Sequence, residues 1–266
     1  MSLKPSGSAT SPNGPNPELY PDLAAAGGLH AALEQVTIEL GLNLVEVWSA
    51  SEEPCEPAAS GASNGRKPLS IYLGSQERWF SVSGWSRGVE LVRGATKDLH
   101  EVAKAAAAWR ASASLHDLRQ LCPFLTFGEL AEAHEHGPAD AVAVKWRLLR
   151  EELRDDIPFP AVRDLVEAAY AEPKLKQLYP FTSHWGLHFS TCTGWPFTWV
   201  VPFIDPLRDG RFRVSGPNRR TVIDEADTAA EAIDIVVAHL PDNLGPAFAG
   251  TASDMKREFV AETDGH

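Results

Sequence analysis

The segment from Tyr179 to Trp199 holds the densest group of side chains that could do chemistry in this 266-residue chain. It reads YPFTSHWGLHFSTCTGWPFTW and contains three of the eight tryptophans, two of the nine histidines and one cysteine. Aromatic side chains with polar tips suit a ligand pocket, because they offer large apolar areas and a few directional donors. They also suit the core of a small sheet, so both interpretations stay open.

His184 and His188 are the candidate catalytic residues in this segment. On a helix, residues four apart could share a metal ion, but the aromatic and Gly neighbours favour a strand, where four residues span about 13 Å. We therefore expect no shared metal. Either imidazole could act as a general acid or base near neutral pH. The alternative is a pair of hydrogen-bonded histidines at a sheet edge.

A ligand in such a pocket would contact the aromatic and polar residues around the two histidines. Cys192 could form a nucleophilic pair with His188, because an imidazole lowers a thiol pKa, although a small buried thiol is the simpler interpretation. Late arginines, Arg213 among them, could bind an anion or form weak ion pairs on a solvated sheet face. The expected substrate-binding residues are Tyr179, Ser183, Trp185, Cys192, Trp195, Trp199 and Arg213.

The sequence contains no Gly-rich phosphate loop and no HExxH. The pattern GxSxG occurs as GASNG at 61–65 and GWSRG at 84–88, but neither lies between an expected strand and an expected helix, as a catalytic Ser elbow requires. His134 and His136 are two apart, so on a helix their rings diverge and cannot share an ion. The sequence therefore predicts neither a metal nor another cofactor.

Composition restricts the partners and the compartment. The net charge of -12 repels phosphate backbones and anionic lipid heads, so we expect neither nucleic acid nor a membrane as partner. Cys55, Cys122 and Cys192 form no CxxC pattern, and the start has no apolar signal-peptide core. A cytoplasmic protein fits these features best.

Hydrophobic periodicity predicts an α+β fold of two antiparallel strand-rich units, each closed by a helix, with a central helical region between them. Residues 1–27 and 255–266 are expected to be tails, and the three regions cover 28–112, 113–178 and 179–254. Expected helices are 29–40, 96–109, 138–153, 160–171 and 228–240. Expected strands are 44–48, 69–73, 78–85, 89–92, 185–190, 197–204, 211–214 and 221–223.

Two pairs of residues have the spacing of a helix capping box, Thr126 with Glu129 and Thr228 with Glu231. The two strand–helix stretches 91–109 and 222–240 also align, with Val102 matching Ile233. A duplicated module would explain this match, as would any strand followed by an amphipathic helix.

Three strings resemble an actinobacterial family of uncharacterised natural-product biosynthesis proteins, a domain-of-unknown-function group. They are GWSRG at 84–88, HEHGPADAVAVKWR at 134–147 and LYPFTSHW at 178–185. The resemblance covers about residues 20–254. It implies a biosynthetic gene-cluster setting and carries over no catalytic residue.

We therefore expect a tailoring or cyclisation protein acting on a small-molecule or peptide intermediate. The alternatives are a non-catalytic accessory protein that binds a substrate or a partner biosynthetic enzyme, and an immunity or resistance protein that blocks a cationic partner by charge complementarity.

Overall fold

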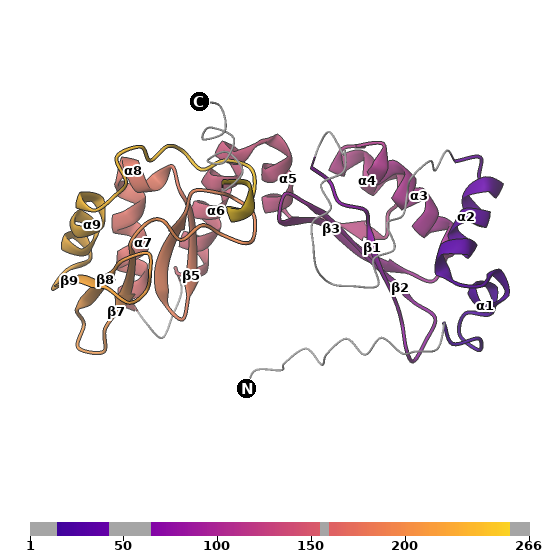
Figure 1. Cartoon of the computed structure of the whole chain (residues 1–266), viewed down its shortest axis with the longest axis horizontal. Coiled ribbons are helices and arrows are strands. Elements are labelled where there is room, and N and C mark those ends of the chain that lie inside the picture. Colours follow the sequence, from indigo (N-terminus) through magenta and orange to yellow (C-terminus); the bar gives the residue numbers. More distant parts are fainter. Residues whose placement is uncertain (1–14, 43–64, 155–159, 256–266) are drawn as a thin grey trace, which may run out of the picture. The chain divides into compact units, whose positions relative to one another are not determined.

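The computed structural model describes residues 15–42, 65–154 and 160–255 of the chain. The chain divides into two compact units, each with its own antiparallel sheet. The first contains Met1–Gly84 and Val92–Thr126, and the second contains Trp85–Leu91 and Phe127–His266. Helices together with two antiparallel sheets confirm the expected α+β class (Figure 1).

The first unit contains a four-stranded antiparallel sheet, with two helices before β1 in the sequence and two more between β3 and β4. Strand β2 alternates buried and exposed residues, with Phe80 and Val82 facing the core. Trp109 is buried at the end of α3, and its indole N–H donates to the Lys67 carbonyl at 2.7 Å. The elements are α1 (Pro21–Ala26), α2 (Leu29–Glu39), β1 (Ser70–Leu73), β2 (Phe80–Ser86), β3 (Val89–Thr96), α3 (Leu99–Arg110), α4 (Leu115–Leu121) and β4 (Leu125–Thr126), and the sheet order is β1-β2-β3-β4.

The second unit begins with helices and continues as a five-stranded meander closed by a last helix. Pro138 and Pro160 each open a helix, where their missing N–H costs nothing. The elements are α5 (Glu129–His136), α6 (Pro138–Glu152), α7 (Pro160–Ala171), α8 (Pro173–Lys176), β5 (Tyr179–Ser183), β6 (Gly186–Ser190), β7 (Phe203–Pro206), β8 (Phe212–Ser215), β9 (Val222–Ala226) and α9 (Ala229–Ala238), and the sheet order is β5-β6-β7-β8-β9.

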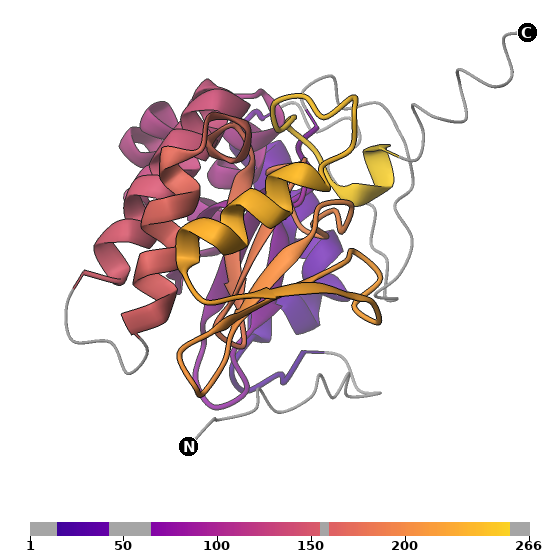
Figure 2. The same ribbon diagram turned by 90° about the vertical axis from the view of Figure 1, so that its left-hand side faces the viewer.

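Helices α6, α7 and α9 cover one face of this second sheet (Figure 2). Leu187, Ile204 and Val214 occupy neighbouring register positions on β6, β7 and β8 and are fully buried in the same core. Because side chains alternate along a strand, the residues next to them point to the opposite face. That opposite face carries Phe181 and His188, which are register partners on β5 and β6.

One capping-box prediction is confirmed and the other is wrong. Thr228 accepts from the Glu231 N–H at 3.2 Å, and the Glu231 carboxylate accepts from the Thr228 N–H at 3.1 Å. Thr126 instead lies in β4, where its hydroxyl donates to the Arg93 carbonyl at 3.1 Å. Gly128 is the N-cap of α5, without a side-chain cap bond. Thr126 therefore belongs to a strand pair, although the local sequence pattern assigned it to the start of a helix.

The strand expected at 197–204 is also wrong in its first part, because β7 begins only at Phe203. Residues 191–202 form a loop that does not pair with β6 or β8, and several of its N–H groups bond to hydroxyls. Thr191 donates to the Thr198 hydroxyl at 2.8 Å, and the Thr198 N–H donates to the Ser190 hydroxyl at 3.2 Å. Pro202 has no N–H to give to a ladder. This loop folds over the face that carries Phe181 and His188.

The remaining expected elements agree with the pattern to within a few residues, and β4 and β5 were not expected as strands. Helix α1 was not expected either: residues 1–27 were predicted to be a tail, but Tyr20 and Leu23 are buried. The strand expected at 44–48 and the loop that holds Cys55 lie outside the described residues. Both strand–helix pairs of the suggested duplication exist, as β3–α3 and β9–α9. The duplication itself stays a prediction.

Candidate functional site

A hollow of about 630 Å³ lies on the second unit, on the sheet face opposite the helices. Three parts of the chain surround it: the end of β5, the loop 191–202, and the turn between β8 and β9. Its volume falls within the range of small-molecule sites. The lining residues are Phe181, Thr182, Ser183, Trp195, Phe197, Trp199, Pro217, Asn218 and Arg219.

Aromatic rings form the walls of this aromatic hollow. Phe181 stacks on Phe197 with ring centroids 4.6 Å apart, and Trp199 meets Phe181 edge-on at 5.4 Å. Trp195 stands at 88° to Phe197 and is 61% exposed. Such offset and edge-to-face pairs hold each other in place. The walls are therefore largely preformed, with one indole left open to solvent.

Arg219 supplies the positive charge of the aromatic hollow. Its guanidinium carbon lies 3.8 Å from the centre of the Trp199 ring, a cation–π contact. The backbone of Arg219 has a left-handed φ of 58°, and its N–H donates to the Gly216 carbonyl at 3.0 Å. The Asn218 side-chain oxygen accepts the N–H groups of Arg220 and Thr221. The turn thus fixes where the guanidinium emerges.

His188 lies behind this aromatic wall and is only 4% exposed. Its ring stacks on Phe181 at 5.1 Å and meets Trp199 edge-on at 5.0 Å. Burial, together with the nearby Arg219 charge, lowers the pKa of His188 to about 4. The imidazole is therefore neutral near pH 7. Its Nδ1 atom is buried and has no hydrogen-bond partner among the described residues.

Gly186 has no side chain, and the Asp205 carboxylate and the His188 imidazole lie in the space that one would occupy. A Cβ at Gly186 would collide with the Asp205 carboxylate and lie 3.2 Å from His188 Nε2. Burial raises the pKa of Asp205, while Arg213 and Arg219 act in the opposite direction. Asp205 and His188 thus share a confined region over Gly186 that a side chain would fill.

The structure brings three of the expected residues into the aromatic hollow, Ser183, Trp195 and Trp199. His184 and Trp185 form the β5–β6 turn, both with left-handed φ, at 51° and 70°. His184 Nδ1 lies 3.2 Å from the Ser183 hydroxyl. Tyr179 is buried and packs on Phe197, and burial raises its pKa to about 12. These three residues do not line the hollow.

Cys192 is fully buried, and its surroundings leave it unsuited to nucleophilic attack. Its thiol lies 3.5 Å from the Gly194 carbonyl and 3.3 Å from the Ser190 hydroxyl. Burial raises its pKa, so thiolate is scarce at neutral pH. Cys192 does not line the aromatic hollow.

Arg213 lies on β8 and bonds to a carboxylate on the neighbouring strand. Its guanidinium donates to Glu225 at 3.0 and 3.1 Å, and Glu225 also receives Arg211 at 2.8 Å. The alternating charges on β8 and β9 thus form ion pairs on a sheet face. The arginine at the aromatic hollow is Arg219, six residues further along the chain.

Six of the lining residues were not predicted from the sequence: Phe181, Thr182, Phe197, Pro217, Asn218 and Arg219. The two phenylalanines lie inside the aromatic segment, and Arg219 belongs to the late arginine group. A turn rich in Gly, Pro and Asn at 216–218 was the available signal for a fixed loop. No local sequence pattern predicted that this turn packs against the segment around Trp199.

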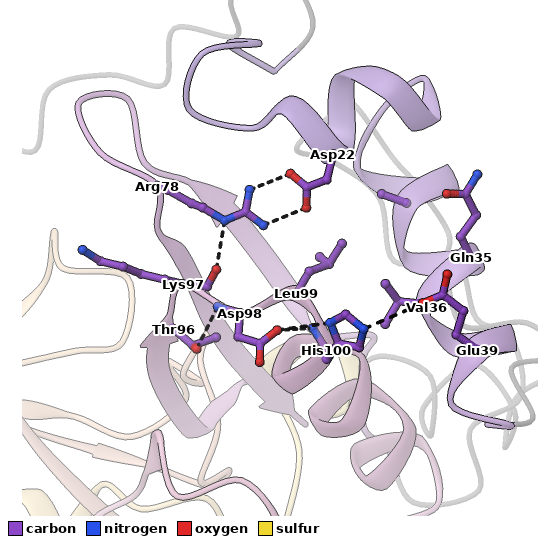
Figure 3. A pocket seen from close by; sticks show the side chains of 11 residues that line it. Asp22, Gln35, Val36, Glu39, Arg78, Thr96, Lys97, Asp98, Leu99 and His100 are labelled. Atoms are coloured by element: carbon purple, nitrogen blue, oxygen red, sulfur yellow. Dashed lines mark hydrogen bonds and ion pairs between the residues drawn. The ribbon is translucent and has the colours of Figure 1, made fainter.

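A second hollow, of about 580 Å³, lies in the first unit around the start of α3 (Figure 3). Its charged side chains bind one another. The Arg78 guanidinium donates two hydrogen bonds, of 2.6 and 2.7 Å, to the Asp22 carboxylate. The His100 ring lies between two carboxylates, with Nδ1 3.3 Å from Asp98 and Nε2 3.8 Å from Glu39. Because these charges are already paired, this hollow is the weaker candidate.

Comparison of the chain with known protein families finds one match. Residues 140–251 match the model described as a family of unknown function, DUF6193. That range is less than half of the chain and includes all of the aromatic hollow. No curated protein and no solved structure matches the chain.

Among the residues that the structure describes, no helix is long and apolar enough to cross a membrane. The same residues also hold no group of three or more His, Cys, Asp or Glu side chains that could bind a metal ion.

Proposed function

We propose that the second unit binds a small organic molecule in the aromatic hollow and serves a natural-product pathway as an accessory binding protein. The pathway setting comes from the resemblance of the sequence strings. The observation that carries the binding role is the preformed wall of Phe181, Phe197 and Trp199 with Arg219 at its rim. Stacked rings around an open volume favour a ligand with a flat apolar part.

The chemistry of the neighbouring groups favours binding over catalysis by a nucleophile. The Cys192 thiol is buried with a raised pKa, and the Tyr179 hydroxyl has a pKa of about 12. Neither forms a nucleophilic anion readily at neutral pH. Fixed aromatic rings and side chains that stay neutral near pH 7 suit a surface that binds a ligand without reacting with it.

The binding proposal is tested by titrating the purified protein with candidate pathway intermediates and following the heat of binding. Trp195→Ala removes the exposed wall and should weaken binding at least about tenfold, as expected for a stacked aromatic anchor. Trp185→Ala is the matched control, because Trp185 is 44% exposed but lies on the β5–β6 turn outside the lining. Equal losses in both variants, or none, contradict the proposal.

A tailoring or cyclisation enzyme is the second candidate, and one observation favours it. The His188 imidazole is neutral, and its buried Nδ1 has no hydrogen-bond partner among the described residues. Its Nε2 lies on the Gly186 side, where the Asp205 carboxylate also lies. An unpartnered acceptor of this kind could take a proton from a substrate that displaces Phe181 or Trp199. Conversion of a pathway intermediate by the wild type, lost in His188→Gln but kept in His184→Gln, would support this candidate. Binding without conversion supports the accessory role.

A further inference from the structure

We propose that the aromatic hollow selects organic anions, with Arg219 as the residue that binds a carboxylate attached to a flat ring. This inference rests on the proposed binding function and names its ligand class. It depends on three features of the described residues: the charge of the lining, the position of the guanidinium and the open face of Trp195.

The lining contains one cation and no acid. Its nine residues include Arg219 but neither Asp nor Glu, although the chain has 36 acidic residues. Asp205 interacts electrostatically with Arg219, but it is half-buried over Gly186 rather than in the lining. The net charge of -12 opposes anions at long range, but short-range contacts decide selectivity inside a hollow.

The guanidinium of Arg219 has its donors available. Among the described residues, no ion pair or side-chain hydrogen bond joins Arg219 to a neighbour, and its contact is with the face of Trp199. Other arginines of the second unit are already bound to carboxylates, namely Arg147, Arg150, Arg211 and Arg213. Stacking on an indole leaves the edge of the guanidinium plane free for a bidentate carboxylate.

The turn positions Arg219 at an energetic cost. A non-Gly residue adopts a left-handed φ only at an energetic cost. Here the Asn218 side chain and the Gly216 carbonyl hold the turn in that conformation. A fixed guanidinium loses less freedom on binding than a flexible surface arginine would, which strengthens recognition.

The ring of the ligand would pack against Trp195, the most exposed aromatic side chain of the lining. Arg219 lies over Trp199, on the turn that borders the same hollow. A planar group carrying a short acidic arm could therefore contact the indole and the guanidinium together.

The test uses 1-naphthylacetate and its neutral amide, 1-naphthylacetamide, titrated into the full-length protein by calorimetry. The two probes share a ring and differ in charge. The wild type should bind the acetate at least about tenfold more tightly, as expected for a charge-assisted bidentate contact. Arg219→Gln should bring the two affinities together, and Arg219→Lys should keep a smaller preference because it retains charge without the planar fork.

Arg220→Gln is the matched control, because Arg220 is the exposed neighbour in the same turn and lies outside the lining. It should keep the wild-type preference. Equal affinity of both probes for the wild type overturns the anion inference and leaves the proposed binding function standing. Loss of the preference in Arg220→Gln overturns it as well, since general surface charge then explains it. Failure of both probes to bind at millimolar concentration contradicts the binding function itself.

Discussion

The imidazole of His188 stacks on the ring of Phe203, with centroids 4.6 Å apart and planes inclined by 26°. Phe181 on β5 stacks on the opposite side of His188 from Phe203 on β7. The ionisable ring of His188 therefore lies in the middle of a row of aromatic side chains on the sheet. Such a position favours the neutral form of histidine, because charging it would require a buried cation among apolar rings. Stability should therefore depend on pH through this residue.

The first prediction concerns the stability of the protein at acidic pH. The pKa of His188 falls from 6.5 to about 4 on folding, so between these values the unfolded chain binds more protons. The free energy of unfolding should then decrease as the pH falls from about 6.5 to 4, by up to about 3 kcal/mol. His188→Phe should reduce this dependence without abolishing it, as measured by urea unfolding at pH 7 and pH 5, because burial also lowers the pKa of His134 to about 4. His136→Gln, on the surface, should keep the wild-type slope, and an unchanged slope in His188→Phe would contradict the assignment.

The second prediction concerns Gly186, where an added Cβ meets the Asp205 carboxylate and His188 Nε2. Gly186→Ala should reduce the free energy of unfolding by about 1–3 kcal/mol, because one of these side chains must move. The Asp205 carboxylate ends a rotatable side chain and is the group expected to yield. In an Asp205→Ala background the same change should cost clearly less, which a double-mutant cycle measures. Additive costs would show that the two residues do not meet.

The third prediction concerns the thiols. Burial raises the pKa of Cys122 to about 11 and also raises that of Cys192. In a Cys55→Ser chain, both thiols should resist Ellman's reagent at pH 8 and react only when urea unfolds the protein. A fast native reaction that disappears in Cys192→Ala would show an accessible thiolate. Cys192 would then return as a candidate nucleophile.

The fourth prediction compares the two threonines that share a capping pattern. Thr228→Ala should destabilise the first turn of α9 by about 1 kcal/mol, because the Glu231 N–H loses its acceptor. Thr126→Ala should leave the first turn of α5 unchanged, since Gly128 is its N-cap. Amide hydrogen exchange of residues 229–232 and 129–132 measures both helix starts. Equal protection losses in the two helices would contradict the structure.

Local signals predicted most of the helices and the strand-rich segments of both units. Prolines at 138 and 160, the Thr228–Glu231 pair and the apolar periodicity of α2 and α3 act within a few residues, and the structure confirms them. Thr126 shows the limit of this reasoning. Its pattern was correct for a cap, but pairing with Arg93, 33 residues away, made it part of a strand.

The amino-acid sequence by itself determined the α+β class, the position of most elements and the aromatic segment as the place for a site, because these depend on residue type and short-range periodicity. Tertiary structure decided which residues of that segment face a ligand. It buried His188 and Cys192, exposed Trp195, and brought Arg219 onto Trp199 from a turn 20 residues away. Strand register and loop packing set these contacts, and both arise from long-range burial of apolar surface that no local pattern encodes.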